Sequence, residues 1–296
     1  MTSPRKRPDR PAHLATVTAT ERTAPEMVRV HLDCPVVRDA DAFPLECTDH
    51  YVKLLFPPEG ASWSWDDEDA DAGLPGRVRE NLPRDEWPVM RTYTLRSWDR
   101  EAGTLIIDFV AHGDSGLAGP WAAGVAPGAR IGFMGPGGAW RPESGYDRLV
   151  LAGDEAAAPA IFAGLEALPY GTPATAYIEV ADAESRLPLP VRAEDDDVTV
   201  VWVERGGATH GTELVRAVTE AGIPAGRTQW FIHGVAEMIR DLRRFLFVEG
   251  GVLKEDVSIS GYWRLGMVED EWQASKREFN QENEAAEAAA TSAAQQ

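Results

Sequence analysis

The chain has 296 residues and a formal net charge of -19, with 29 Lys and Arg against 48 Asp and Glu. This length predicts about two domains, and a hydrophobic fraction of 44% suffices for a core in each. The acidic excess argues against nucleic acid as a partner, because phosphates would be repelled over most of the surface.

Residues 1–11 form a basic leader rich in Pro and Arg, which we expect to be disordered. No aromatic residue is interleaved with its charges, so a solvated leader is favoured over a nucleic-acid site. No apolar signal core follows it, and no apolar run approaches the roughly 18 residues of a membrane span. We therefore expect a cytoplasmic monomer. Its two cysteines, Cys34 and Cys47, lack metal-site spacing and are expected to be free thiols.

Residues 12–143 are predicted to form an antiparallel β-barrel, because several strand patterns occur with few helices. Segments rich in β-branched residues, separated by Pro and Asp, are predicted as strands. They are residues 13–20, 27–33, 50–56, 91–98, 104–112 and 129–135. A long acidic loop between Pro57 and Pro88 is expected to hold a short helix near residues 77–81. A second short helix is expected over residues 117–125.

Residues 144–268 alternate between strand and helix patterns, which is typical of βαβ units and an open parallel sheet. Strands are predicted over residues 147–153, 174–181, 198–204, 228–234 and 256–263, and helices over residues 155–168, 212–221 and 236–249. Residues 269–296 begin as a polar helix and decay into a low-complexity tail, which we expect to be frayed. The predicted fold is thus a β-barrel followed by an open α/β domain.

The segment Arg91-Thr92-Tyr93-Thr94-Leu95-Arg96 lies on a predicted barrel strand. Side chains alternate along a strand, so Arg91, Tyr93 and Leu95 share one face. A tyrosine there can lie against a flavin ring, and a neighbouring guanidinium can pair with phosphate. An ordinary half-buried strand with exposed arginines explains the same spacing equally well.

Two further segments follow predicted strands. His112 to Ala122 is rich in glycine and precedes a helix, an arrangement that favours pyrophosphate, although turn glycines also occur in plain connections. Leu151 to Ile161 follows the first strand of the second domain, where open sheets bind ligands. It lacks the G-x-G-x-x-G glycines, and Asp154 and Glu155 also suit the cap of a plain helix.

These segments, taken in order along the chain, resemble the siderophore-interacting protein family, the flavin-dependent ferric-siderophore reductases of the ferredoxin–NADP reductase superfamily. The resemblance spans residues 12–272. It implies an FAD-binding barrel over 12–143 and an NAD(P)H-binding domain over 144–268. The segments that carry it are HYVKLLFP, RTYTLRSWD, DFVAHGDSGLAGPWA, GPGGAW, LAGDEAAAPAI and GYWRLGMVEDEW.

The resemblance implies a set of cofactor-binding residues. They are Arg91, Tyr93, Thr94, Leu95, His112, Gly113, Gly116, Ala118, Gly119, Pro120 and Trp121 in the barrel, with Asp154, Glu155 and Ala158 in the second domain. The strand residues are expected to hold the flavin ring and phosphate, and the residues from 112 to 121 the pyrophosphate and adenine. The family often has Ser where this chain has Gly119, so a hydroxyl donor to the pyrophosphate is missing.

The electron donor is expected to be NADH or NADPH. Asp154 and Glu155 would repel a pyrophosphate placed on their helix, so the nicotinamide contact is expected to be transient. The acidic residues of the second βα turn, residues 179–186, suit a free 2′-hydroxyl and favour NADH, whereas Arg186 suits a 2′-phosphate. Reduced ferredoxin is the alternative donor, disfavoured because such partners are usually acidic, as this chain is.

The expected chemistry needs no catalytic acid or base from the protein. A hydride passes from nicotinamide to flavin N5, and the reduced flavin gives single electrons to Fe(III) in an oxygen-ligand chelate. Fe(II) is held loosely by such ligands, so reduction releases the iron. The resemblance implies that Lys53 and Arg264 bind the ferric siderophore, with Arg141 as a third candidate. A solvent-facing strand lysine is the alternative for Lys53.

Three other functions are compatible with parts of this pattern. A general NAD(P)H-dependent flavin or ferric-chelate reductase would use the same chemistry without siderophore selectivity. A siderophore-binding protein without activity would keep the fold and lack FAD. A nucleic-acid binder would depend on residues 1–11. The flavin segments count against the second of these, the acidic charge counts against the third, and the general reductase stays open as the alternative.

Overall fold

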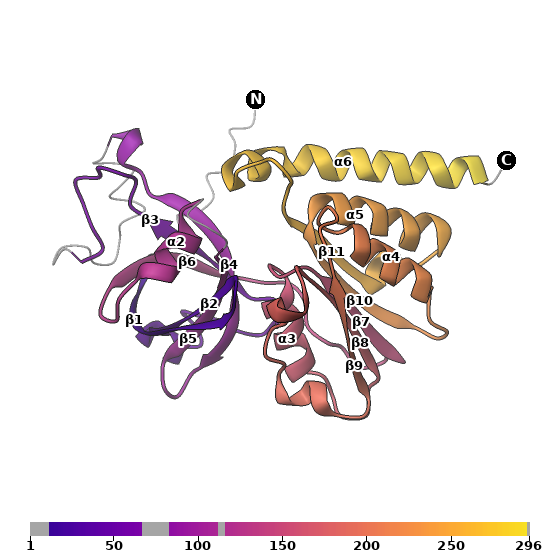
Figure 1. The fold of residues 1–296 in the computed structure, drawn as a ribbon, viewed down its shortest axis with the longest axis horizontal. Helices are drawn as coiled ribbons and strands as arrows, with labels where there is room; N and C mark the ends of the chain where they lie inside the picture. The colour runs from indigo at the N-terminus through magenta and orange to yellow at the C-terminus, as the bar shows by residue number, and fades with distance from the viewer. Residues whose placement is uncertain (1–11, 67–82, 112–115, 295–296) are drawn as a thin grey trace. The chain divides into compact units, whose positions relative to one another are not determined.

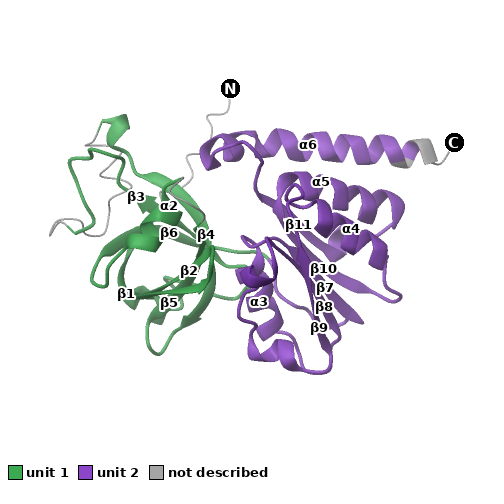
Figure 2. Cartoon of the chain, in the orientation of Figure 1, with its two compact units in different colours: residues 1–139 green, residues 140–296 purple. Residues whose placement is uncertain are grey.

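The computed structural model describes residues 12–66, 83–111 and 116–294. The chain divides into two compact units, residues 1–139 and 140–296 (Figure 2). The basic leader, the short helix expected near residues 77–81, and two expected cofactor residues, His112 and Gly113, lie outside the described residues.

The first unit is a closed antiparallel barrel with the strand order β1-β2-β5-β4-β3-β6 (Figure 1). Its strands are β1 (Ala12–Ala24), β2 (Met27–Asp33), β3 (Tyr51–Phe56), β4 (Val89–Asp99), β5 (Thr104–Val110) and β6 (Arg130–Gly137). Short helices connect them: η1 (Pro35–Arg38), η2 (Arg84–Glu86) and α2 (Ala118–Gly124). Because side chains alternate along a strand, Val28, Val30 and Leu32 of β2 all enter the core.

The second unit is a five-stranded parallel sheet with the order β11-β10-β7-β8-β9. The strands are β7 (Arg148–Gly153), β8 (Ala174–Val180), β9 (Val198–Glu204), β10 (Thr228–Val235) and β11 (Val257–Trp263). The helices are α3 (Ala158–Glu166), η3 (Ala183–Ser185), η4 (Val191–Glu194), α4 (Thr212–Ala221), α5 (Ala236–Arg243), η5 (Arg244–Glu249), η6 (Lys254–Asp256) and α6 (Glu269–Ala294). The predicted fold class is confirmed.

The strand order places a topological switch point between β7 and β10. The chain starts at β7, moves outward through β8 and β9, and then returns to the other side of β7 as β10 and β11. Right-handed crossovers in opposite directions put α3 on one face of the sheet and α4 and α5 on the other (Figure 1). Ligands of open α/β sheets bind at the carboxyl ends of the strands beside such a point.

The helix expected over residues 155–168 is shorter, as α3, and two other helices differ more from the sequence prediction. The helix expected over residues 236–249 ends as α5 at Arg243 and continues as the π-helical segment η5. The tail expected to fray is helical to Ala294. Tertiary contacts explain the second difference: Trp272 is fully buried, and Glu287 accepts hydrogen bonds from Arg243 Nε at 2.6 Å and Lys254 Nζ at 2.7 Å.

Among the described residues, no helix combines the length and apolarity that a membrane crossing requires. The same part of the chain has no cluster of three His, Cys, Asp or Glu side chains suited to a metal ion. Both cysteines are free thiols, and burial raises the pKa of the Cys34 thiol to about 12.

Candidate functional site

Strand β4 carries the expected flavin residues of the barrel. Arg91 is half-buried, and its Nη1 donates to the carbonyl oxygen of Met90 at 2.8 Å. Thr94 is buried, Leu95 is fully buried in the barrel core, and Tyr93 packs partly against that core. One short run of strand thus holds a guanidinium, a phenol and a hydroxyl.

An aromatic series links β4 to helix α2. The Tyr93 ring lies 4.3 Å from the Phe109 ring, centroid to centroid, at an interplanar angle of 37°. Phe109 in turn lies 5.7 Å from Trp121, which also meets Phe56 edge-on at 5.5 Å. These contacts fix the orientation of Tyr93 and Trp121, the two expected aromatic residues of the cofactor site.

The start of α2 approaches strand β5 more closely than a side chain would allow. A Cβ on Gly119 would lie 2.9 Å from the carbonyl oxygen of Val110 and 3.3 Å from the Cα of Ala111. Gly116 has φ +85°, a conformation that favours glycine. Ala118 is buried, and Pro120 is half-buried on the same helix. The absence of a serine hydroxyl at residue 119 therefore has a packing reason.

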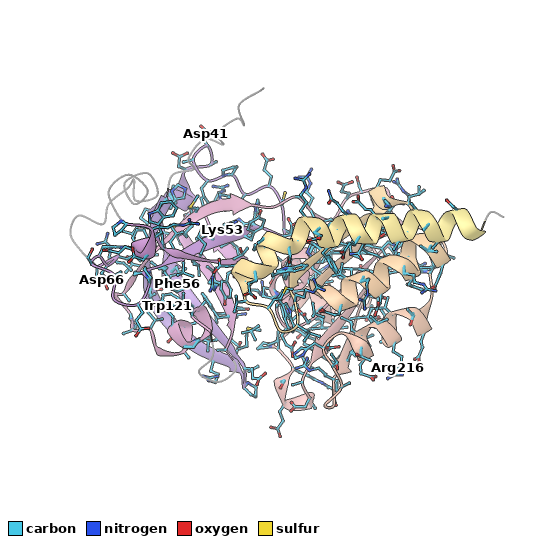
Figure 3. The ribbon with its side chains drawn as sticks, turned by 90° about the horizontal axis from the view of Figure 1, so that it is seen from above. Asp41, Lys53, Phe56, Asp66, Trp121 and Arg216 are labelled. Atoms are coloured by element: carbon cyan, nitrogen blue, oxygen red, sulfur yellow. The ribbon has the colours of Figure 1, made fainter. Side chains whose placement is uncertain are left out.

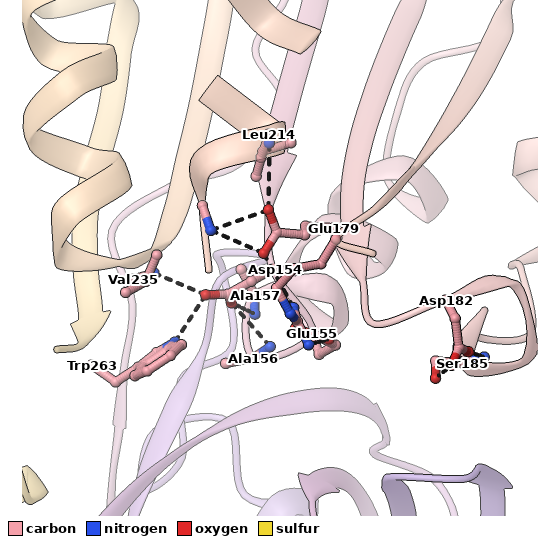
Figure 4. Close-up of polar contacts among 12 residues, drawn as sticks. Asp154, Glu155, Ala156, Ala157, Glu179, Asp182, Ser185, Leu214, Val235 and Trp263 are labelled. Carbon is pink, nitrogen blue, oxygen red and sulfur yellow. Dashed lines mark hydrogen bonds and ion pairs between the residues drawn. The ribbon is translucent and has the colours of Figure 1, made fainter. Parts of the chain in front are cut away.

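Asp154 follows β7 directly and joins three strands at their carboxyl ends (Figure 4). Its Oδ1 accepts from the backbone N–H of Ala156 at 3.1 Å and of Ala157 at 3.3 Å. Its Oδ2 accepts from the backbone N–H of Val235 and from Trp263 Nε1, both at 2.8 Å. Asp154 is only 1% exposed, so it caps the turn before α3 and ties β10 and β11 to β7.

Burial raises the pKa of the Asp154 carboxyl to about 7, and the nearby charge of Glu155 acts in the same direction. The hydrogen bonds from Trp263 and Val235 act in the opposite direction, because they stabilise the ionised form. Burial and the four N–H donors thus act on Asp154 in opposite directions, as expected of a carboxyl enclosed at the edge of the sheet.

A second buried carboxylate, Glu179, lies one residue before the end of β8. It is fully buried, and its oxygens accept from the backbone N–H of Gly211 at 2.9 and 3.1 Å and of Leu214 at 3.4 Å. Arg205, which follows β9, donates to Glu179 at 3.2 Å and pairs with Glu155 at 3.1 Å. Glu155 therefore pairs with an arginine instead of capping α3.

The second βα turn offers little to a nucleotide phosphate. Asp182 accepts from both the backbone N–H and the hydroxyl of Ser185, at 3.0 and 2.9 Å. Arg186, which would suit a 2′-phosphate, pairs with Glu204 at 2.8 Å. Glu184 is exposed. The turn is acidic, and its arginine already has a carboxylate partner.

The three expected siderophore residues have different surroundings. Lys53 is half-buried on β3 between the core residues Val52 and Leu54, so it lies on the outer face of the barrel wall (Figure 3). Arg264 follows β11, with Nε 3.5 Å from a Glu237 oxygen and Cζ 5.5 Å from the centre of the Phe279 ring. Arg141 is exposed near the start of the second unit.

Sequence reasoning missed the contacts that organise this edge of the sheet. Glu179 was weighed only as a cofactor-preference residue, and Arg205 and Gly211 were not singled out. Arg205 and Gly211 follow the predicted strand that became β9, and this position could have identified them, because loops at the carboxyl ends of parallel strands converge on one edge of the sheet. Ala158, by contrast, is a buried first-turn residue of α3.

The barrel residues fit an FAD molecule in their chemistry. Arg91, Tyr93 and Thr94 provide a cation, an aromatic ring and a hydroxyl on one strand. The missing Cβ of Gly119 makes room for the backbone of Val110, whereas Gly116, ahead of α2, presents open backbone with no heavy atom within 4 Å of a Cβ built there. Such backbone allows close approach of a phosphate-bearing ligand.

Comparison with known proteins identifies both units. Residues 16–140 match the family described as Siderophore-interacting FAD-binding domain, and residues 146–266 match the family described as Siderophore-interacting protein. These matches agree with the division of the chain into a barrel and a parallel sheet.

Three known proteins illustrate the similarity. An uncharacterized protein of Mycobacterium tuberculosis is 41% identical over 287 residues, 91% of this chain and 96% of its own. Ferric vibriobactin reductase ViuB of Vibrio cholerae is 27% identical over 235 residues, 78% of this chain and 83% of its own. The crystal structure of the siderophore-interacting protein SipS from Aeromonas hydrophila superposes with a TM-score of 0.74, 26% identity and coverage of 92% and 98%. The chain therefore belongs to the siderophore-interacting protein family, and its barrel is that family's FAD-binding domain.

Proposed function

We propose that this protein is an FAD-dependent ferric-siderophore reductase that takes electrons from NADH in preference to NADPH. The observation that carries the proposal is the match of both units to the siderophore-interacting family, together with the set of donors on β4. The similarity to a ferric vibriobactin reductase supports the same activity.

The barrel would hold FAD through Arg91, Tyr93 and Thr94, with the backbone of residues 116–121 beside the pyrophosphate. When bound, FAD would accept a hydride from the nicotinamide and pass single electrons to Fe(III). Phe109 contributes by orienting Tyr93 and Trp121, since it packs against both rings. No side chain is required as a general acid or base.

The preference for NADH follows from charge. The second βα turn carries Asp182 and Glu184, and its Arg186 is paired with Glu204. A 2′-phosphate adds negative charge to a donor that must approach a chain of formal charge -19, so long-range repulsion disfavours the encounter with NADPH even when the adenosine end of the donor is not held.

Lys53 and Arg264 are proposed to attract the ferric chelate. A chain with a formal charge of -19 repels an anionic chelate over most of its surface, so local cations decide where the chelate docks. Arg141 is a third candidate because it is exposed.

The test is charge reversal at these cations. Lys53→Glu and Arg264→Glu should each lower kcat/KM for an anionic ferric siderophore severalfold, with FAD content unchanged. Arg216→Glu on α4 is the matched control, because Arg216 is exposed and, among the described residues, forms its ion pairs with Glu213 and Glu220 of its own helix (Figure 3). If turnover is unchanged in both test variants, Lys53 and Arg264 do not belong to the substrate site. A siderophore and iron–citrate turned over equally well would favour a general ferric-chelate reductase instead.

A further inference from the structure

Three helices of the second unit begin at the carboxyl edge of the sheet: α3 after β7, α4 after β9 and α5 after β10. The first N–H groups of a helix have no partner within the helix and favour anions. In open α/β sheets these groups hold the pyrophosphate of a dinucleotide. Whether such amides are available therefore decides how a nicotinamide dinucleotide is held.

Asp154 already accepts from the amides at two of these helix starts. Its two oxygens accept from Ala156 and Ala157 ahead of α3 and from Val235, the residue immediately before α5 (Figure 4). Trp263 provides a fourth N–H, so both oxygens are surrounded by donors. These four N–H groups are therefore already engaged and are not available to a phosphate oxygen.

Glu179 does the same at the third helix start. It accepts from Gly211, the residue immediately before α4, and from Leu214 in the first turn. The Glu179 side chain is 0% exposed, so it cannot move aside without unpacking β8. Gly211 has φ +84°, and an added Cβ would lie 2.6 Å from Met238, so the loop is fixed where Glu179 meets it.

The cations at this edge are also engaged. Arg205 is 10% exposed in its side chain and pairs with both Glu155 and Glu179. Arg186 pairs with Glu204. A pyrophosphate at the switch point would meet two buried carboxylates and arginines that already have partners.

We propose that Asp154 and Glu179 exclude the pyrophosphate of the electron donor from the switch point, so that a dihydronicotinamide is recognised through its nicotinamide end alone. This inference rests on the proposed function, because it concerns the donor of that reaction. It makes the two carboxylates specificity-determining residues and predicts that the adenosine and pyrophosphate of NADH contribute almost nothing to reactivity.

The test compares NADH with reduced nicotinamide mononucleotide, which lacks the pyrophosphate bridge and the adenosine. Both donors are mixed anaerobically with the FAD-loaded protein, and loss of the oxidised flavin absorbance gives a second-order rate constant for each. The two constants are expected to agree within about tenfold, or 1.4 kcal/mol. A larger advantage for NADH would overturn the inference, because it would show that the distal half of the donor is bound.

A binding measurement removes the dependence on electron transfer. ADP-ribose carries the adenosine and pyrophosphate without nicotinamide, and calorimetric titration into the FAD-loaded protein should show a Kd weaker than about 1 mM. A tighter Kd would overturn the inference. If neither dihydronicotinamide reduces the flavin, the proposed nicotinamide donor is wrong, and the ADP-ribose titration still decides whether the pyrophosphate is excluded.

Discussion

Gly119→Ala should destabilise the barrel, although alanine is normally the better residue in a helix. A Cβ at this position would lie 2.9 Å from the carbonyl oxygen of Val110, and that atom is backbone and cannot rotate away. Forcing an extra group into a packed contact costs about 1–3 kcal/mol. At about 2–4 °C per kcal/mol for a chain of this size, Tm should fall by about 2–12 °C. Gly119→Ser restores the family's usual hydroxyl, and its Tm should fall by at least as much, because serine also adds a Cβ.

Gly124→Ala is the matched control on the same helix. No heavy atom lies within 4 Å of a Cβ built there, so the substitution should leave stability unchanged or raise it by up to about 1 kcal/mol. Thermal unfolding is followed for both variants at equal FAD saturation. If Gly119→Ala and Gly124→Ala have the same Tm, close packing does not explain the glycine at residue 119.

Other substitutions test the second unit. Trp272→Ala removes a fully buried indole that anchors α6 and should cost about 3–5 kcal/mol by chemical denaturation; a loss below 1 kcal/mol would mean that α6 is not docked. Burial lowers the pKa of His233 to about 3, aided by the charge of Lys276, so the folded state binds fewer protons than the unfolded state between pH 3 and 6.5. The free energy of unfolding therefore decreases as pH falls through that window, by about 2 kcal/mol between pH 6.5 and 5. In His233→Gln, which has no imidazole to protonate, Tm should fall less steeply with decreasing pH. If Tm decreases with pH equally steeply in the variant and in the unsubstituted protein, titrating groups other than His233 cause the decrease. Glu237→Gln frees Arg264 from its carboxylate and should raise kcat/KM about two- to fivefold for an anionic chelate at low salt, with no gain for a neutral one.

The fold could be predicted from the sequence because its signals are local. Alternating β-branched residues mark the barrel strands, and the change to strand–helix alternation after residue 146 marks the parallel sheet. The α6 helix was underestimated because its stability is tertiary. Its composition predicts fraying, whereas buried Trp272 and the pairs of Glu287 with Arg243 and Lys254 hold it to Ala294.

The arrangement at the sheet edge could be predicted only in part. Asp154 and Glu155 were recognisable at a helix start, but the partners that define their roles are distant in sequence. Asp154 meets Val235 across 81 residues, and Glu155 meets Arg205 across 50. Nothing in the local pattern distinguishes a carboxylate that fills the start of a neighbouring helix from one that faces solvent.

The central claim is that this chain passes electrons from a dihydronicotinamide through FAD to a ferric siderophore. The most direct measurement is anaerobic absorbance spectroscopy of the purified protein with FAD, NADH, and then a ferric siderophore together with a ferrous trap. The account predicts oxidised flavin bands that bleach with NADH and return on addition of the siderophore, with trapped Fe(II) appearing in step. A protein that cannot be reconstituted with FAD, or a reduced flavin that the ferric siderophore does not reoxidise, would contradict it.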